Sequence, residues 1–351
     1  MILYLSLSIA FANMRPTSPS ERPEMTQSRH AVQFQPTRRT LVAGAAALAL
    51  LPTGTAWAAE TVRLAMVQSW WPTTIAMAAQ RLKLFEKEGI KAEITVYKGG
   101  APSFEALAAG AADINVNGAY LVALGRGKGV MSRIVATAGT KYAGWHLVVK
   151  KDSPIRSAAD LAGKKVGISA NGSISDFLAL WTIKNRNAKF TRVPLGAGGI
   201  VPSLASGNVD AIVIWSPVSY KILQDGTGRS IINFADEVQE DLNAGWIATD
   251  EMISKRPQAV QGTLNALFGA AQYLQKNRQF AIDLIAEINE IPKDVATKEY
   301  EASILSASTD GVIVPQAAER SVELGKAGGL ANLAPASDTY VQKFKPVPTR
   351  P

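Results

Sequence analysis

The heptapeptide "LASGNVD" at residues 204–210 repeats the pattern of "LAAGAAD" at residues 107–113, and this pair decides the fold. Each copy ends a short predicted helix and leads into an apolar segment, "INVN" at 114–117 or "AIVIW" at 211–215. The glycine of each copy permits the left-handed backbone that ends a helix, after which the chain enters a strand. Chance is the alternative, because alanine-rich helices often end in glycine. The shared place of both copies after a Gly-rich turn favours two equivalent lobes.

Predicted strands and helices alternate on both sides of the repeat. The predicted strands are 61–67, 92–97, 113–117, 164–169, 190–195 and 210–215, and the helices between them are 72–89, 103–110, 174–185 and 200–207. This alternation implies an α/β fold with a parallel sheet covered by helices. Further strands at 145–155 and 245–253 are expected to cross between the lobes, with helices at about 256–290 and 313–327 completing the first lobe. Two crossings permit closure about a hinge.

The N-terminal segment has the layout of an export signal. Arg38 and Arg39 directly precede an apolar stretch, 41–51, and an A-x-A pattern follows at 56–58. The twin arginines stand where a Tat signal has them, so cleavage is expected after Ala58. A membrane-anchoring helix is the alternative, but the apolar stretch is short of the roughly 20 residues that a span needs.

The first 24 residues do not fit this layout, so we expect the natural start at Met25 and exclude residues 1–58 from the fold. Of the chain's net charge of +8, residues 1–58 contribute +3, which leaves +5 for the remainder. The remainder has no run of five Lys or Arg residues, so nucleic acid is not an expected partner. The chain has no cysteine, which excludes disulfides and thiolate metal sites.

Together these features resemble the periplasmic solute-binding proteins of ABC importers, nearest to the aliphatic sulfonate, taurine and nitrate binders, a group that includes pyrimidine-precursor binders. The resemblance covers nearly the whole mature chain, and "SAADLAGKKVGI" (157–168) and "DAIVIWSPV" (210–218) carry it most strongly. The stretches that carry it are "AAQRLKLFEKEGIKAEITVYKGGAPSFEALAAGAADINVNG", "LVVKKDSPIRSAADLAGKKVGIS", "VPSLASGNVDAIVIWSPVSYKILQDG" and "WIATDEMISKRPQAVQGTLNAL".

The resemblance implies a two-lobed periplasmic-binding-protein fold of type II, with a ligand cleft between the lobes and two hinge crossovers. We expect residues 59–145 and 245–351 to form the first lobe and 146–244 the second. It also implies a monomeric periplasmic component that closes on a small anion and delivers it to a membrane permease and its ATPase. Nitrate, a pyrimidine precursor and a sensor role without transport stay open as alternatives.

Candidate ligand residues follow from strand ends, because ligands of open α/β sheets bind outside the carboxyl ends of the strands. Several candidates also precede helices, whose free N–H groups bind anions. The candidates in the first lobe are Gln68, Ser69, Trp70, Trp71, Gly100, Ser103, Asn117, Gly118 and Ala119. Those at the crossover and in the second lobe are Trp145, Asn171, Gly172, Ser173, Ser175, Asp176, Gly198, Gly199, Trp215 and Ser216. A helix cap or a turn is the simpler interpretation of any one of them, most of all Ser103.

The adjacent pair Trp70-Trp71 is the most unusual of these features, because neighbouring side chains point in different directions and one core cannot easily bury both. We expect one ring to line the cleft, with Trp70 favoured. Bare nitrate needs no aromatic wall, so the tryptophans favour a ligand with an apolar or ring portion. Tyr142, Trp145 and Trp246 serve equally well as packing residues, and Asp176 pairs with a ligand amine or only caps its helix.

An enzyme is the main rival to a binding protein. His146 is the only histidine after residue 58, so a Ser-His-Asp arrangement would have to use it. The sequence has no G-x-S-x-G elbow and no cluster with metal-ligand spacing, and "GAGG" at 196–199 is not a nucleotide loop. These absences favour a binding protein without catalysis, cofactor or metal.

Overall fold

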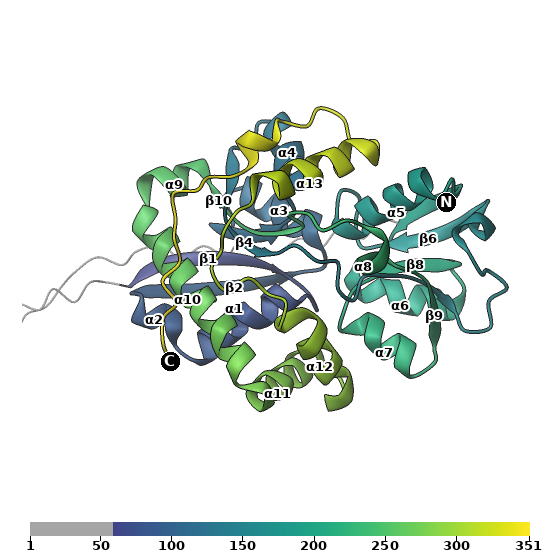
Figure 1. The fold of residues 1–351 in the computed structure, drawn as a ribbon, viewed down its shortest axis with the longest axis horizontal. Helices are drawn as coiled ribbons and strands as arrows, with labels where there is room; N and C mark the ends of the chain where they lie inside the picture. The colour runs from purple at the N-terminus through teal and green to yellow at the C-terminus, as the bar shows by residue number, and fades with distance from the viewer. Residues whose placement is uncertain (1–58) are drawn as a thin grey trace, which may run out of the picture. The chain divides into compact units, whose positions relative to one another are not determined.

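The computed structural model describes residues 59–351, which contain two five-stranded sheets (Figure 1). The predicted export signal lies outside the described residues. The first sheet comprises β1 (Glu60–Val67), β2 (Ile90–Tyr97), β3 (Ile114–Asn117), β4 (Ser132–Gly139) and β10 (Ala244–Thr249). The second comprises β5 (His146–Lys150), β6 (Lys164–Ile168), β7 (Phe190–Pro194), β8 (Ala211–Ile214) and β9 (Gly228–Asn233). We call each sheet with its helices a lobe.

The two sheets have the same topology, as the sequence repeat predicts. Their strand orders are β2-β1-β3-β10-β4 and β7-β6-β8-β5-β9, and in each the fourth strand runs antiparallel to its neighbours. The predicted wholly parallel sheet is therefore wrong, because the strand that arrives from the other lobe runs the opposite way. The α/β class and the two equivalent lobes are confirmed.

The repeated heptapeptides occupy equivalent places. Gly110 and Gly207 both have positive φ, 71° and 81°, and end their helices as predicted. Asp113 accepts a hydrogen bond from the Arg63 backbone N–H at 2.8 Å, and Asp210 accepts one from the Lys165 backbone N–H at 2.9 Å. Each aspartate thus ties the start of one strand to its parallel neighbour, which is a physical reason for the shared pattern.

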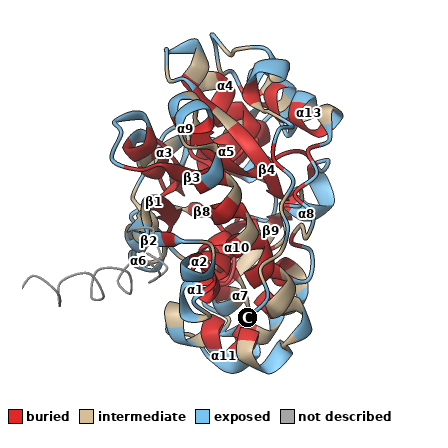
Figure 2. Cartoon of the chain, turned by 90° about the vertical axis from the view of Figure 1, so that its left-hand side faces the viewer, coloured by how far each residue is buried: buried red, intermediate tan, exposed pale blue. Residues whose placement is uncertain are grey.

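Helices cover both lobes and bury the apolar strands, and Figure 2 shows buried residues on the strands and on the inner sides of the helices. The first lobe has α1 (Trp71–Arg81), α2 (Leu84–Lys87), α3 (Gly100–Ala108), α4 (Ala119–Gly127) and α9 (Asp250–Lys255). The second has α5 (Ile174–Asn185), α6 (Ala197–Ser206), α7 (Val218–Gln224) and α8 (Phe234–Glu237). The C-terminal part contains α10 (Pro257–Lys276), α11 (Arg278–Asn289), α12 (Lys293–Glu299), a π-helical turn (Tyr300–Ile304) and α13 (Pro315–Ala327).

Three predicted elements end earlier than the sequence indicated, and the first is the strand expected over 145–155, which ends at Lys150. The helix expected over 72–89 is divided into α1 and α2, because Lys83 adopts a left-handed backbone with φ of 55°. The strand expected over 245–253 ends at Thr249, whose hydroxyl caps α9 by accepting from the Met252 N–H at 3.1 Å. The sequence prediction also omitted β4, β9, α4, α7, α8 and α12. No helix among residues 59–351 is long and apolar enough to cross a membrane.

Candidate functional site

A narrow cavity lies between the carboxyl ends of the strands of the two lobes. Its lining residues are Val67, Trp70, Gly100, Asn117, Trp145, Ser169, Ser173, Ile174 and Trp215. The volume of this cavity is only ≈ 10 Å³, about enough for one water molecule. The lobes must therefore separate before this site can admit an organic ligand.

The first-lobe wall of the cavity is a buried amide network beside the start of α3. Asn117 donates through Nδ2 to Asn115 Oδ1 at 2.8 Å and to the Gly100 carbonyl at 3.1 Å. Ser103 is not the predicted helix cap; its hydroxyl donates to the Gly100 carbonyl at 2.8 Å and accepts from Asn115. A Cβ at Gly100 would lie 2.5 Å from Asn117 Oδ1, so a larger residue there would have to displace Asn117 or the start of α3. The network fixes the N-terminus of α3 against the cavity.

The second-lobe wall is a triangle of serine hydroxyls at the start of α5. Ser169, Ser173 and Ser175 are buried, and their three Oγ atoms lie 2.8–2.9 Å from one another. Ser173 caps α5, and its hydroxyl also donates to the Ala170 carbonyl at 2.7 Å. The N-termini of α3 and α5 therefore face the same small space from opposite lobes.

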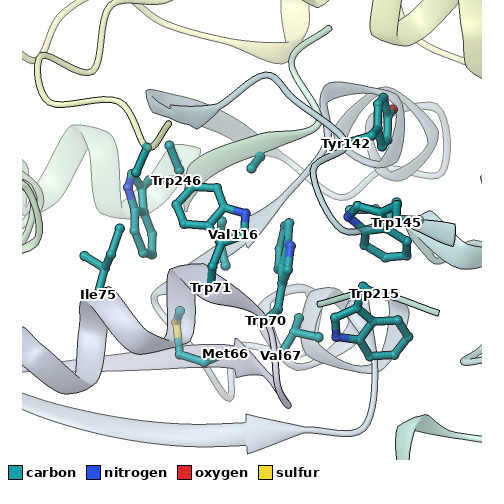
Figure 3. Close-up of a cluster of buried hydrophobic side chains, with 14 of the residues drawn as sticks. Met66, Val67, Trp70, Trp71, Ile75, Val116, Tyr142, Trp145, Trp215 and Trp246 are labelled. Carbon is teal, nitrogen blue, oxygen red and sulfur yellow. The ribbon is translucent and has the colours of Figure 1, made fainter. Parts of the chain in front are cut away.

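Three tryptophans form the remaining wall (Figure 3). The rings of Trp145 and Trp215 have centroids 5.4 Å apart, while Trp70 meets Trp71 edge to face at 6.2 Å. Trp70 is 3% exposed, and its indole Nε1 has no hydrogen-bond partner among the described residues. A buried donor without an acceptor is costly, so this N–H is suited to an acceptor atom of a ligand.

The cavity has anion-binding character without a charged side chain. Among residues 59–351, none of the lining residues is ionisable. The free N–H groups and dipoles of two helix N-termini converge there, together with the Trp70 N–H. Such a site favours a small anionic head group, while the indole rings favour an apolar or ring portion.

Direct contacts between the lobes hold the cleft shut. Trp215 donates through Nε1 to the Gln68 carbonyl at 3.2 Å, and the Ala197 N–H donates to the Lys98 carbonyl at 2.9 Å. The rings of Tyr120 and Phe177 stack across the boundary with centroids 4.8 Å apart. The structure is therefore of the closed form, in which the two lobes already meet.

Not all of the predicted site residues line the cavity. Six do: Trp70, Gly100, Asn117, Trp145, Ser173 and Trp215. Ser103 and Ser175 support them from behind. Gln68 and Ser69 line a neighbouring hollow, and Asn171, Gly172 and Asp176 line another. Outside the lining are Trp71, Gly118, Ala119, Gly198 and Ser216.

Asp176 is occupied within the protein. Its carboxylate accepts from the Gly172 N–H at 2.8 Å and pairs with Arg192, so its role as a helix-end acid accounts for its position. Sequence reasoning omitted Val67, Ser169 and Ile174 from the lining. Ser169 carried a usable signal, because it directly follows the last residue of β6 and strand ends were the criterion.

We expect alanine at Trp70 and at Trp71 to have different effects. Trp71 packs against Gly139, where an added Cβ would lie 2.9 Å from its ring, so Trp71→Ala should lower the free energy of unfolding by about 3–5 kcal/mol. Trp70→Ala should weaken binding of a short sulfonate such as methanesulfonate roughly tenfold or more, since it removes a donor to the head group. Urea unfolding and binding titrations measure the two effects. Unchanged affinities in both variants would make the pair plain packing residues.

The two lobes and the cleft between them define a fold of the periplasmic-binding-protein type. The NMT1/THI5-like family model matches residues 72–281, and the chain belongs to this family. A Brucella abortus protein named "Putative binding protein" is 26% identical over 311 residues, 84% of this chain and 92% of its own. An Escherichia coli protein named "Putative aliphatic sulfonates-binding protein" is 27% identical over 222 residues, 62% of this chain and 69% of its own.

Solved structures show the same fold. The alkanesulfonate-binding protein SsuA from Xanthomonas axonopodis pv. citri, bound to MOPS, aligns with a TM-score of 0.70 at 19% identity, over 80% of this chain and 97% of that one. An enzyme is also similar in sequence: 2'-hydroxybiphenyl-2-sulfinate desulfinase of Rhodococcus erythropolis is 24% identical over 192 residues, 39% of this chain and 52% of its own. The fold therefore accompanies both binding and catalysis.

Proposed function

We propose that this protein binds a small organosulfonate in the cleft between its lobes and releases it to a membrane permease with an ATPase partner. The observation that carries the proposal is the convergence of two helix N-termini, a serine triangle and the unpartnered Trp70 N–H on one cavity with aromatic walls. A sulfonate head group presents three acceptor oxygens to these donors. The alkyl or ring portion matches the tryptophans.

The relatives support the same class of ligand, since proteins named for aliphatic sulfonates and alkanesulfonates share the sequence pattern or the fold. In this proposal, residues 59–145 and 245–351 form one lobe, residues 146–244 form the other, and residues 1–58 direct export to the periplasm. The protein acts as a monomer. The contacts between the lobes and the narrow cavity support capture by closure about the two crossovers.

Catalysis by this chain has little support. His146, the only histidine after residue 58, is buried, and burial lowers its pKa to about 4, which makes it a weak base at neutral pH. Its Nδ1 lies 3.0 Å from Ser230 Oγ, and neither residue lines the cavity. The chain has no cysteine, so a thiolate nucleophile is excluded. No group of three or more His, Asp or Glu residues in 59–351 is arranged to hold a metal ion.

A thermal-shift screen of residues 59–351 tests the proposal. Organosulfonates are expected to raise the unfolding temperature in proportion to the logarithm of ligand concentration over Kd. Taurine, nitrate, thiamine pyrimidine and aromatic carboxylates belong in the same screen, because they separate the ligand classes that share this fold. Stabilisation by nitrate alone, or conversion of a sulfinate to products, would overturn the proposed ligand or the non-catalytic role.

A further inference from the structure

A second hollow lies on the other side of Trp70. Its lining residues are Gln68, Ser69, Trp70, Thr73, Met77, Val96, Ile288, Asn289 and Glu290, and its volume is ≈ 260 Å³. The loop from β1 to α1, the end of β2 and the end of α11 form its sides. Trp70 lines both this hollow and the cavity, so it lies between the two spaces.

The narrow cavity alone is too small for the proposed ligand. Its ≈ 10 Å³ holds about one water molecule, whereas the hollow beyond Trp70 is large enough for an alkyl chain or a ring. A larger hollow of ≈ 750 Å³ beside α3 and α5 shares no lining residue with the cavity. A ligand in the cavity that displaces the Trp70 side chain therefore reaches the hollow behind it.

The lining of this hollow indicates which part of a ligand it accepts. Met77, Val96 and Ile288 supply apolar surface, and Val96 is 43% exposed. Its one charged lining residue is Glu290, an acid, which disfavours a second anionic group there. The buried Trp70 N–H, without a partner among the residues that the structure describes, gains an acceptor or solvent when the ring turns.

We propose that Trp70 is a movable wall and that the hollow behind it is a subsite for the uncharged organic portion of the ligand. The inference rests on the proposed sulfonate function. The head group stays with the donors at the N-termini of α3 and α5, while the organic portion passes the displaced indole and lies on Met77, Val96 and Ile288. The length of ligand that binds best is then set by this subsite.

Chain-length selectivity tests the subsite. Wild-type protein should bind 1-octanesulfonate more tightly than methanesulfonate, by about fourfold for each methylene that becomes buried. Val96→Trp and Met77→Trp fill the hollow from two different elements without touching the head-group donors. Each should weaken octanesulfonate binding at least about tenfold and leave methanesulfonate affinity within about twofold. Leu180→Trp, which fills the hollow beside α5, is the matched control and should change neither.

The outcomes separate the two proposals. If wild-type protein binds both sulfonates but the two filling variants weaken them equally, or weaken neither, the subsite is wrong and the proposed function stands. Loss of octanesulfonate selectivity in Leu180→Trp instead would place the organic portion in the other hollow. If wild-type protein binds neither sulfonate, the proposed function fails and the subsite with it.

Discussion

Glu299→Gln is expected to remove much of the pH dependence of stability between pH 4.5 and 7. Glu299 is 1% exposed, and burial raises the pKa of its carboxyl to about 7. Ser303 donates to Oε2 at 3.0 Å, but Oε1 has no partner and no cation pairs with the carboxyl among residues 59–351. Hydroxyl hydrogen bonds therefore compensate only part of the cost of burying the ionised form.

The direction of the effect follows from proton binding. A carboxyl with a raised pKa holds its proton in the folded state at pH values where the unfolded chain has lost it. Wild-type stability should therefore fall as pH rises from about 4.5 to 7 and stay low above that, with Glu299 contributing on the order of 3 kcal/mol. Urea unfolding at pH 5 and pH 8 measures the difference in the free energy of unfolding between the two pH values. In Glu299→Gln this difference should be smaller by the contribution of Glu299.

Asp241 provides the matched comparison. It is also fully buried, accepts from the Tyr142 hydroxyl at 2.9 Å, and has its pKa raised to about 7 by burial. Asp241→Asn should remove a similar share of the pH dependence, and the double variant should remove both shares. If both variants kept the full wild-type change of the free energy of unfolding with pH, both carboxylates would be ionised in the folded protein at pH 5.

Gly100→Ala is expected to weaken ligand binding about tenfold to a hundredfold and to destabilise the fold by about 1–3 kcal/mol. The new Cβ would lie 2.5 Å from Asn117 Oδ1, in a buried network that also contains Asn115 and Ser103. Either Asn117 turns and loses its bonds or the start of α3 moves. Both changes displace donors of the cavity. Binding titrations on the folded variant measure the effect.

Gly198→Ala is the control for this substitution. Gly198 also lies at the start of a helix, α6, but an added Cβ there has no atom within 4 Å, and the residue does not line the cavity. The variant should keep wild-type affinity and gain a little stability, since alanine favours the helix over glycine. Equal affinity losses at Gly100 and Gly198 would mean that the head group lies elsewhere.

The sequence predicted the parts of the fold that depend on local patterns. Each heptapeptide has a left-handed glycine that ends a helix just before a strand, as predicted, because the same local geometry recurs in each lobe. The link from each aspartate to the neighbouring strand was not predicted. The division of the helix at Lys83 and the antiparallel course of β10 were not predicted, because tertiary contacts determine them.

The strand-end rule selected Trp70, Asn117 and Ser173, and the structure brings the three together at one cavity, since carboxyl strand ends from both lobes meet there. The rule could not separate Gly100 from Gly198, because both precede helices and only the packing around each differs. The rule also could not show that Asp176 accepts from the Gly172 N–H and pairs with Arg192, since the ion pair depends on the position of a neighbouring strand.

Titration calorimetry of residues 59–351 with an alkanesulfonate tests the central claim most directly. The account predicts one binding site per chain in the wild-type protein, with affinity reduced in Gly100→Ala and retained in Gly198→Ala. The absence of binding by any organosulfonate, or binding that Gly100→Ala leaves unchanged, would contradict it.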